Sequence, residues 1–309
     1  MNLSIWIKQL RAPGFTLAGS ICIPLGAAIA WYEQGIFDAS LFILTWIAFV
    51  LILEGCFLTN EYYDYRTGCD PNVASKDVTP FSGGSRVLPE RLLDPEVVLK
   101  ISYLLHLLGC GLGLYLAIKR SLFILPLGLL GFFFSYFYTA PPLRLSSRGL
   151  GEIITGINCG LLATLGSYLV QTGRFSWLPF FASLTPSILL GTLLWVNEIP
   201  DVDADRSAGK LTMVARIGRR KAAHIYPFLI ATAYLLLLIE VGLHLLPTPT
   251  LIALSTIPLA FHAMLTIVRN HSDSKKLIPG LRSNILNTLI IISMITISFL
   301  SPTLYSLFP

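Results

Sequence analysis

Long apolar stretches separated by short polar segments dominate the sequence. Nine of them approach the roughly 20 residues that a helix needs to cross about 30 Å of hydrocarbon. Stretches such as 121–131 and 285–300 lack the polar face that a soluble helix needs. The nine cover residues 14–32, 40–59, 98–118, 122–138, 151–171, 178–198, 222–242, 247–267 and 283–306. The pattern predicts an all-α polytopic membrane protein with nine transmembrane helices, in one domain over residues 1–309.

Composition and charge extend this interpretation. The chain is 54% hydrophobic and 13% charged, whereas soluble domains carry about 25% charged residues. Apart from Lys119, Arg120 and Arg174, the basic residues lie in the N-terminal tail or around the loops after the second, fourth, sixth and eighth stretches. Because basic flanks stay in the cytoplasm, we expect a multi-pass protein of the cell (inner or plasma) membrane, with a cytoplasmic N-terminus and the C-terminus outside. The net charge of +5 then reports topology in the lipid bilayer, and no nucleic-acid partner is expected.

Two acidic motifs depart from the apolar pattern, both on the side predicted to be cytoplasmic. The first is Asn60-Glu-Tyr-Tyr-Asp64-Tyr-Arg66-Thr-Gly68-Cys-Asp70. The second is Asn197-Glu-Ile-Pro-Asp201-Val-Asp203-Ala-Asp205-Arg206, followed by Gly209-Lys210. Each opens with Asn and has Asp four residues later, which indicates a weak internal repeat. Residues four apart share one face of a helix, although Pro200 should interrupt the helix before Asp201.

Such motifs are suited to a metal–diphosphate complex. Adjacent carboxylates repel one another unless a cation lies between them, and magnesium binds through a few carboxylates, with water and phosphate completing its shell. Arg and Lys supply further donors to phosphate. Stabilising a departing diphosphate in this way leaves an allylic carbocation for an electron-rich partner to capture. The simpler alternative is that the Asp residues only end the spans in solvated loops, but two similar clusters on one side favour a binding site.

These residues resemble the UbiA superfamily of intramembrane aromatic prenyltransferases over essentially the whole chain. The first motif, Tyr138-x-x-Pro-Pro-Leu, Gly149-Leu-Gly-Glu152 and Gly166-Ser-Tyr-Leu-Val-Gln-Thr-Gly173 are most similar to menaquinone-pathway enzymes that prenylate 1,4-dihydroxy-2-naphthoate. The second motif, through Lys210-Leu-Thr, fits the superfamily. The resemblance implies one bundle of nine helices around a central cavity that opens to the cytoplasmic side.

The resemblance also implies roles for individual residues. It implies Mg²⁺ as cofactor, and polyprenyl diphosphate and an aromatic acceptor as substrates, with loss of carbon dioxide when dihydroxynaphthoate is the acceptor. The implied magnesium–diphosphate ligands are Asn60, Asp64, Asp70, Asp201 and Asp205. The implied catalytic residues are Asp64, Asp201 and Tyr138, and the implied substrate-binding residues are Arg11, Arg66, Arg86, Asn197, Lys210 and Arg144. Simpler readings are that Arg11, Arg86 and Lys210 are membrane anchors and that Tyr138 belongs to an interfacial belt.

Two departures leave alternatives open. The simplest family pattern has an acidic residue where this chain has Gly68, and Tyr138 lacks the following lysine of many benzoate-using members, so Arg144 or Arg148 is the candidate for an acceptor carboxylate. Other acceptors remain possible, namely 4-hydroxybenzoate, homogentisate, a tetrapyrrole or a glycerol-phosphate lipid. A secondary transporter is a remote alternative, since transporters keep such carboxylates near the bilayer midplane. Glu54, buried in an apolar stretch, has no assigned role.

Overall fold

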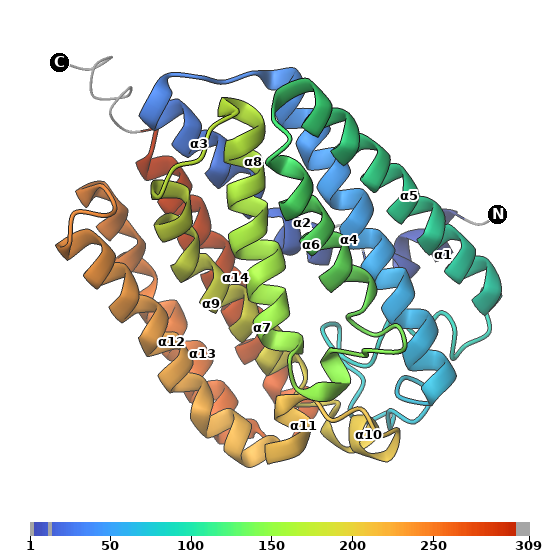
Figure 1. Cartoon of the computed structure of the whole chain (residues 1–309). Helices are drawn as coiled ribbons and strands as arrows, with labels where there is room; N and C mark the ends of the chain where they lie inside the picture. The colour runs from blue at the N-terminus through green and yellow to red at the C-terminus, as the bar shows by residue number, and fades with distance from the viewer. Residues whose placement is uncertain (1–2, 12–13, 301–309) are drawn as a thin grey trace.

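The computed structural model describes residues 3–11 and 14–300, and in this part every regular element is a helix. The helices run side by side, with the short helices α10 and α11 at one end (Figure 1). They are α1 (Leu3–Gln9), α2 (Gly14–Ser20), α3 (Cys22–Gln34), α4 (Ala39–Thr67), α5 (Pro95–Arg120), α6 (Ile124–Tyr136), η1 (Ser146–Arg148), α7 (Gly151–Thr155), η2 (Gly156–Leu162), α8 (Ala163–Thr172), α9 (Leu178–Asn197), α10 (Val202–Ser207), α11 (Met213–Ile217), α12 (Arg219–Gly242), η3 (Thr248–Thr256), α13 (Ile257–Asn270) and α14 (Ser274–Ser298).

Eight helical segments of the described part are long and apolar enough to cross a membrane. They are Gly14–Gln34, Ala39–Thr67, Pro95–Arg120, Gly151–Thr172, Leu178–Asn197, Arg219–Gly242, Thr248–Asn270 and Ser274–Ser298. The predicted stretch 122–138 forms a shorter apolar helix, Ile124–Tyr136. The prediction of an all-α polytopic membrane protein is therefore confirmed. Residues 301–306, the end of the last predicted stretch, lie outside the described residues.

Local sequence explains where the long helices begin and end. The carboxylate of Asp38 caps α4 by accepting a hydrogen bond from the Leu41 amide at 3.0 Å, and Asp94 caps α5 just before Pro95. Gly68 ends α4 with a φ of +88°, a conformation that glycine adopts without steric cost. Because α4 runs as far as Thr67, it carries the first acidic motif out of the apolar layer.

Small residues let the spans approach one another closely, as is usual between membrane helices. A Cβ on Gly26 of α3 would lie 2.3 Å from the backbone oxygen of Thr164 on α8. The same two helices are joined by a hydrogen bond of 2.7 Å from the Ser167 hydroxyl to the Ile23 carbonyl. The π-helical element η2 packs on α9 in the same way, since a Cβ on Gly156 would lie 2.4 Å from the Ser187 carbonyl oxygen.

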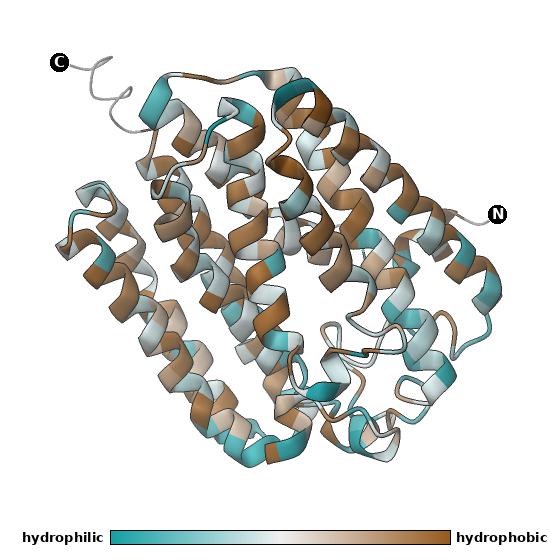
Figure 2. Cartoon of the chain, viewed as in Figure 1, coloured by the Kyte–Doolittle hydropathy of each residue, from teal (hydrophilic) through white to brown (hydrophobic). Residues whose placement is uncertain are grey.

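Polar residues gather at the end of the bundle that carries α10 and α11 (Figure 2). We call this end the motif face; it comprises segments 68–94, 137–150 and 198–218. Arg219, at the start of α12, joins the first and third of these segments: its guanidinium donates to Asp77 at 3.1 Å and to Asp203 at 3.0 Å. Ser274, at the start of α14, also donates to Asp77, at 2.5 Å.

We expect Gly26→Ala to destabilise the folded protein by about 1–3 kcal/mol, because the added methyl group must push α3 away from α8. Thermal unfolding in detergent would measure the effect. Gly111→Ala is the matched control, since Gly111 is exposed on α5 and a Cβ there has nothing within 4 Å. Equal unfolding temperatures for the two variants would contradict this account of the α3–α8 contact.

Candidate active site

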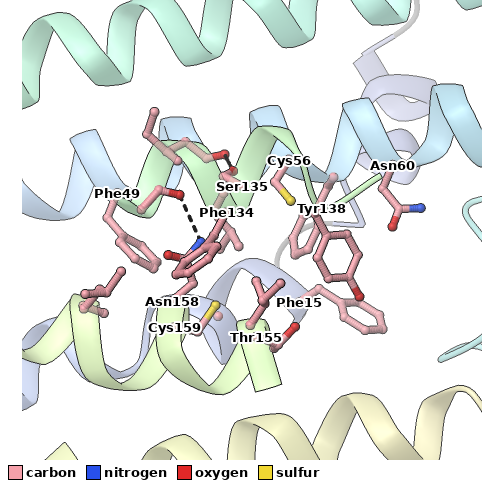
Figure 3. A pocket seen from close by; sticks show the side chains of 18 of the residues that line it. Phe15, Phe49, Cys56, Asn60, Phe134, Ser135, Tyr138, Thr155, Asn158 and Cys159 are labelled. Atoms are coloured by element: carbon pink, nitrogen blue, oxygen red, sulfur yellow. Dashed lines mark hydrogen bonds between the residues drawn. The ribbon is translucent and has the colours of Figure 1, made fainter. Parts of the chain in front are cut away.

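A cavity of about 560 Å³ lies inside the bundle, with its polar end under the motif face. Its wall is contributed by α2 to α6, α7, η2, α8 and α9. The charged and amide side chains at the polar end are Arg11, Asn60, Glu61, Asp64, Asp70, Asn197, Glu198, Asp201, Asp205 and Lys210. Most other lining residues are apolar or aromatic, and Figure 3 shows several of them between α4, α6 and η2.

The first motif has the geometry that its spacing predicts. Asn60 and Asp64 lie one turn apart on α4, and the Asn60 amide donates to Asp64 Oδ2 at 2.5 Å. Asp64 is 6% exposed, so its carboxylate is buried at the head of the cavity. The expectation that these two side chains share a face is confirmed.

The second motif is interrupted where proline predicts. Helix α9 ends at Asn197, Pro200 follows, and α10 begins just after Asp201. Asp201 Oδ2 accepts a hydrogen bond of 3.0 Å from the Gly83 amide, which joins the loop after α4 to the second motif. Asp201 Oδ1 and Asn197 Oδ1 are buried without a hydrogen-bond partner among the described residues. These two oxygen atoms are therefore free to accept a ligand.

Lys210 joins the two motifs. Its ammonium lies 2.7 Å from Asp64 Oδ2 and 3.8 Å from Asp205 Oδ1, and the three side chains are between 6% and 15% exposed. Burial alone lowers the pKa of a lysine, but Asp205 and Asp64 outweigh it and hold the pKa of Lys210 well above its usual value. The ammonium thus provides positive charge between carboxylates that come from distant parts of the sequence.

The remaining carboxylates are only partly compensated. Burial raises the pKa of Asp201 to about 6 and that of Asp205 to about 7, with Gly83 and Lys210 opposing the rise at Asp201 and Lys210 opposing it at Asp205. Burial and the nearby Glu61 and Asp64 raise the pKa of Asp70 well above its usual range. Within residues 3–11 and 14–300, no three Asp, Glu, His or Cys side chains lie close enough together to hold a metal ion. This donor set fits a hard cation that takes one or two carboxylates from the protein and its other ligands from water or phosphate.

Asp70 and Arg86 lie close together, but they face the site differently. Asp70 lines the cavity, and a Cβ on Gly84 would fall 2.4 Å from its carboxylate oxygen, so only glycine allows the loop to approach so closely. Arg86 does not line the cavity; its guanidinium donates to the Asp70 carbonyl at 2.5 Å. The contact made by Arg86 is therefore one that shapes the loop, not one that faces the cavity.

The other predicted basic residues are distributed unevenly. Arg11 lines the cavity, with its guanidinium 4.2 Å from the centre of the Phe15 ring. Arg66 is exposed on the outer side of α4, 6.0 Å from the Tyr62 ring centre, and the structure does not bring it to the cavity. Arg144 lies beside a second, smaller cavity of about 170 Å³ that shares Asp64 and Lys210 with the first.

Tyr138 lines the main cavity just after α6. Its hydroxyl approaches the start of α7, since a Cβ on Gly151 would lie 3.0 Å from the Tyr138 oxygen. In Figure 3 its ring lies with Phe15 on the Asn60 side of the cavity. Tyr138 therefore stands where the polar end of the cavity meets the apolar wall.

Sequence reasoning missed two buried glutamates near the site. Glu61 accepts hydrogen bonds from the amide and the hydroxyl of Ser85, at 2.8 Å and 2.6 Å, and so fastens the loop after α4 to the helix. Glu198 lines the cavity beside the buried Glu152, and burial together with this neighbouring carboxyl group raises the pKa of Glu198 well above its usual range. Glu61 and Glu198 each follow a motif asparagine directly, but the sequence spacing does not show which way their side chains point. Glu54, by contrast, joins α4 to α2 by accepting from Thr16 at 2.5 Å and does not line the cavity.

The fold and the site together define a membrane protein with an internal cavity that is polar at one end and apolar along its wall. The chain belongs to the UbiA prenyltransferase family, whose sequence profile matches residues 21–306. It is a prenyltransferase.

Similar proteins agree with this assignment. The chain is 28% identical to 2-carboxy-1,4-naphthoquinone phytyltransferase of Synechocystis over 88% of its length and 85% of that protein. It is 27% identical to 1,4-dihydroxy-2-naphthoate octaprenyltransferase of Bacillus subtilis, over 76% of its length and 72% of that protein. Its fold is like that of a UbiA homologue from Archaeoglobus fulgidus bound to DMAPP and Mg²⁺, with a TM-score of 0.61 at 16% identity over 95% and 98% of the two chains.

We expect Asp205→Asn to stabilise the protein in chelator more at pH 8 than at pH 5. The unfolded carboxyl ionises near its usual pKa of 3.8, whereas the folded one keeps its proton up to about 7. The stability of the wild-type protein therefore falls as pH rises through this window, and asparagine removes the fall. Unfolding at both pH values should show a difference on the order of 2–3 kcal/mol. Asp203→Asn is the control, because the Asp203 side chain is 75% exposed; a pH-independent effect of Asp205→Asn would refute the argument.

Proposed function

We propose that this enzyme transfers a polyprenyl group from polyprenyl diphosphate to 1,4-dihydroxy-2-naphthoate, with Mg²⁺ as cofactor and loss of carbon dioxide. The observation that carries the proposal is the meeting of both acidic motifs with Lys210 at the polar head of an otherwise apolar cavity. An anionic diphosphate fits the head, and a hydrocarbon chain fits the wall. We further propose that the motif face is cytoplasmic, because most basic residues of the chain lie on that side.

The head of the cavity supplies the groups that a diphosphate needs. Asn60, Asp64, Asp70, Asp201 and Asp205 would hold magnesium, with one or two of the carboxylates bound to it directly and the others through water, and Asn197 offers a further free oxygen. When bound, the metal would neutralise the diphosphate and stabilise it as a leaving group. Lys210 and Arg11, which line the same end, would donate directly to phosphate oxygens. Arg66 and Arg86 remain a sequence prediction that the cavity geometry does not support.

Tyr138 and Phe15 form the border between head and wall, where the bond to the departing diphosphate would break. Aromatic faces attract positive charge through the negative potential of the ring. We propose that these rings stabilise the developing allylic cation. The apolar wall excludes water, which would otherwise capture the cation before the acceptor does.

The choice of acceptor rests on different support. The two relatives described above are named for naphthoquinone and dihydroxynaphthoate substrates. In this chain the smaller cavity is lined by Arg144 and Arg148 and shares Asp64 and Lys210 with the larger one. Two guanidinium groups beside the reacting end suit a small aromatic acid, and we propose that they bind the carboxylate of the acceptor.

Purified protein supplied with Mg²⁺ and a prenyl diphosphate should prenylate 1,4-dihydroxy-2-naphthoate and release one carbon dioxide per product. We expect Asp64→Asn and Asp201→Asn to lower the rate at least about 100-fold, because each removes charge stabilisation from the leaving group. Asp203→Asn is the matched control within the second motif, since Asp203 pairs with Arg219 away from the cavity. Product and carbon dioxide are both quantified.

Each outcome of this assay has a defined meaning. Transfer to 4-hydroxybenzoate, homogentisate, a tetrapyrrole or a glycerol-phosphate lipid, but not to the naphthoate, would refute the acceptor and keep the donor site. Full activity of Asp64→Asn and Asp201→Asn, or activity unaffected by chelator, would refute the metal–diphosphate site itself.

Lys210→Met should weaken binding of prenyl diphosphate at least about tenfold, because it leaves Asp64 and Asp205 uncompensated beside an anionic ligand. Titration with the donor in the absence of acceptor measures the affinity. Lys275→Met is the control, because Lys275 is exposed at the start of α14. Unchanged affinity in Lys210→Met would show that this lysine only anchors the loop.

A further inference from the structure

We infer that Gly113, Gly128 and Gly166 keep open the far arm of the cavity, the part lined by Thr45, Leu116 and Val170 at the opposite end from Asp64, and so determine how long a prenyl tail the enzyme accepts. The inference rests on the proposed function, because it concerns the tail of the proposed donor. It adds the residues that select among donors of different length.

The cavity is long enough to enclose many isoprene units of a prenyl tail. Its lining residues on α4 run from Asp64 to Thr45, a rise of about 28 Å along the helix at about 1.5 Å per residue. This approaches the hydrocarbon thickness of about 30 Å. A donor whose diphosphate lies at Asp64 therefore has an enclosed path for many isoprene units.

The wall of the far arm has the chemistry of a hydrocarbon site. It includes Ala48, Leu116, Leu125 and Val170. Its hydroxyl group at Thr45 is already used, since it donates to the Leu41 carbonyl at 2.7 Å. A tail in this arm meets apolar surface and leaves no polar group of these residues unsatisfied.

Three glycines on three different helices line this arm without packing against anything. Gly113 lies on α5, Gly128 on α6 and Gly166 on α8, and a Cβ at any of them would meet nothing within 4 Å. Gly109 lines the same cavity but is a packing glycine, because its Cβ would lie 2.8 Å from Ile52. Glycine destabilises a helix interior relative to alanine. Helix packing does not require these three glycines, and what they provide is space inside the cavity.

The arm also borders the bilayer. Leu114 on α5 and Leu129 on α6 line the cavity and are 50% and 67% exposed on the surface of the bundle. Figure 1 shows α5 and α6 on the same side of the bundle. The far arm therefore lies close to the lipid-facing surface of the bundle.

The test compares donor profiles of wild type, Gly113→Leu, Gly128→Leu and Gly166→Leu with dimethylallyl, geranyl, farnesyl, geranylgeranyl and longer prenyl diphosphates. We expect short donors to react within about twofold of wild type and the longest donors to lose at least about tenfold in kcat/KM. Gly111→Leu is the matched control, because Gly111 lies on α5 and has open space around its Cβ but, unlike the three test glycines, does not line the cavity. Alanine variants at the three sites should shift the profile in the same direction by less.

A second readout separates this inference from the proposed function. Affinity for each prenyl diphosphate is measured by thermal shift without acceptor, so it does not depend on catalysis or on the identity of the acceptor. Loss of affinity for long donors alone supports the inference even if naphthoate is the wrong acceptor. An unchanged length profile in all three variants, or an equal loss for every donor length while Gly111→Leu stays normal, overturns it. If the wild-type protein binds no prenyl diphosphate, both proposals fail together.

Discussion

The charge balance at Lys210 is the interaction on which the site depends. Asp64 and Asp205, one from each motif, lie 141 positions apart in the sequence, and the Lys210 ammonium contacts both of them. Buried carboxylates repel one another strongly where the surroundings are poorly polarisable. The Lys210 ammonium offsets part of this repulsion between the two motifs when no substrate is bound. Because Lys210 follows the second motif closely and Gly209 turns the chain with a φ of +73°, the compensating charge is folded back from the same segment.

The loops of the motif face carry this balance into the rest of the structure. Glu61 fastens Ser85, and the Gly83 amide reaches Asp201, so the loop after α4 spans the gap between the two motifs. Arg219 ties the same loop to α12 by way of Asp77. The loops around the head of the cavity are therefore held in place by backbone and side-chain hydrogen bonds from several helices. A substitution in the loop after α4 should therefore alter the geometry of both motifs.

The sequence allowed prediction of the features that follow from periodicity. Apolar stretches gave the spans, the four-residue spacing gave the contact between Asn60 and Asp64, and Pro200 gave the break before α10. It did not allow prediction of side-chain direction in the loops. Arg86 has a φ of +66° and turns toward the Asp70 carbonyl, and Arg66 points to the outer side of α4 toward Tyr62. No periodic pattern predicts the turn at Arg86, because it depends on a contact with a residue 16 positions away, whereas Arg66 does not share a face with Asp64 because residues two apart on a helix do not face each other.

The position of the site at the end of the spans follows from the opposite needs of the two parts of the proposed donor. A diphosphate needs cations and hydrogen-bond donors, and these groups are too costly to hold at the centre of a bilayer. Its tail needs apolar surface, which the spans provide along their length. Placing the carboxylates where α4 and α9 leave the apolar layer satisfies both needs with one continuous cavity. The reacting bond then lies at the border, near Tyr138, where the polar head can stabilise the leaving group and the apolar wall can protect the cation. On this reasoning, head chemistry and tail length are controlled by separate residues, and evolution can change one without disturbing the other.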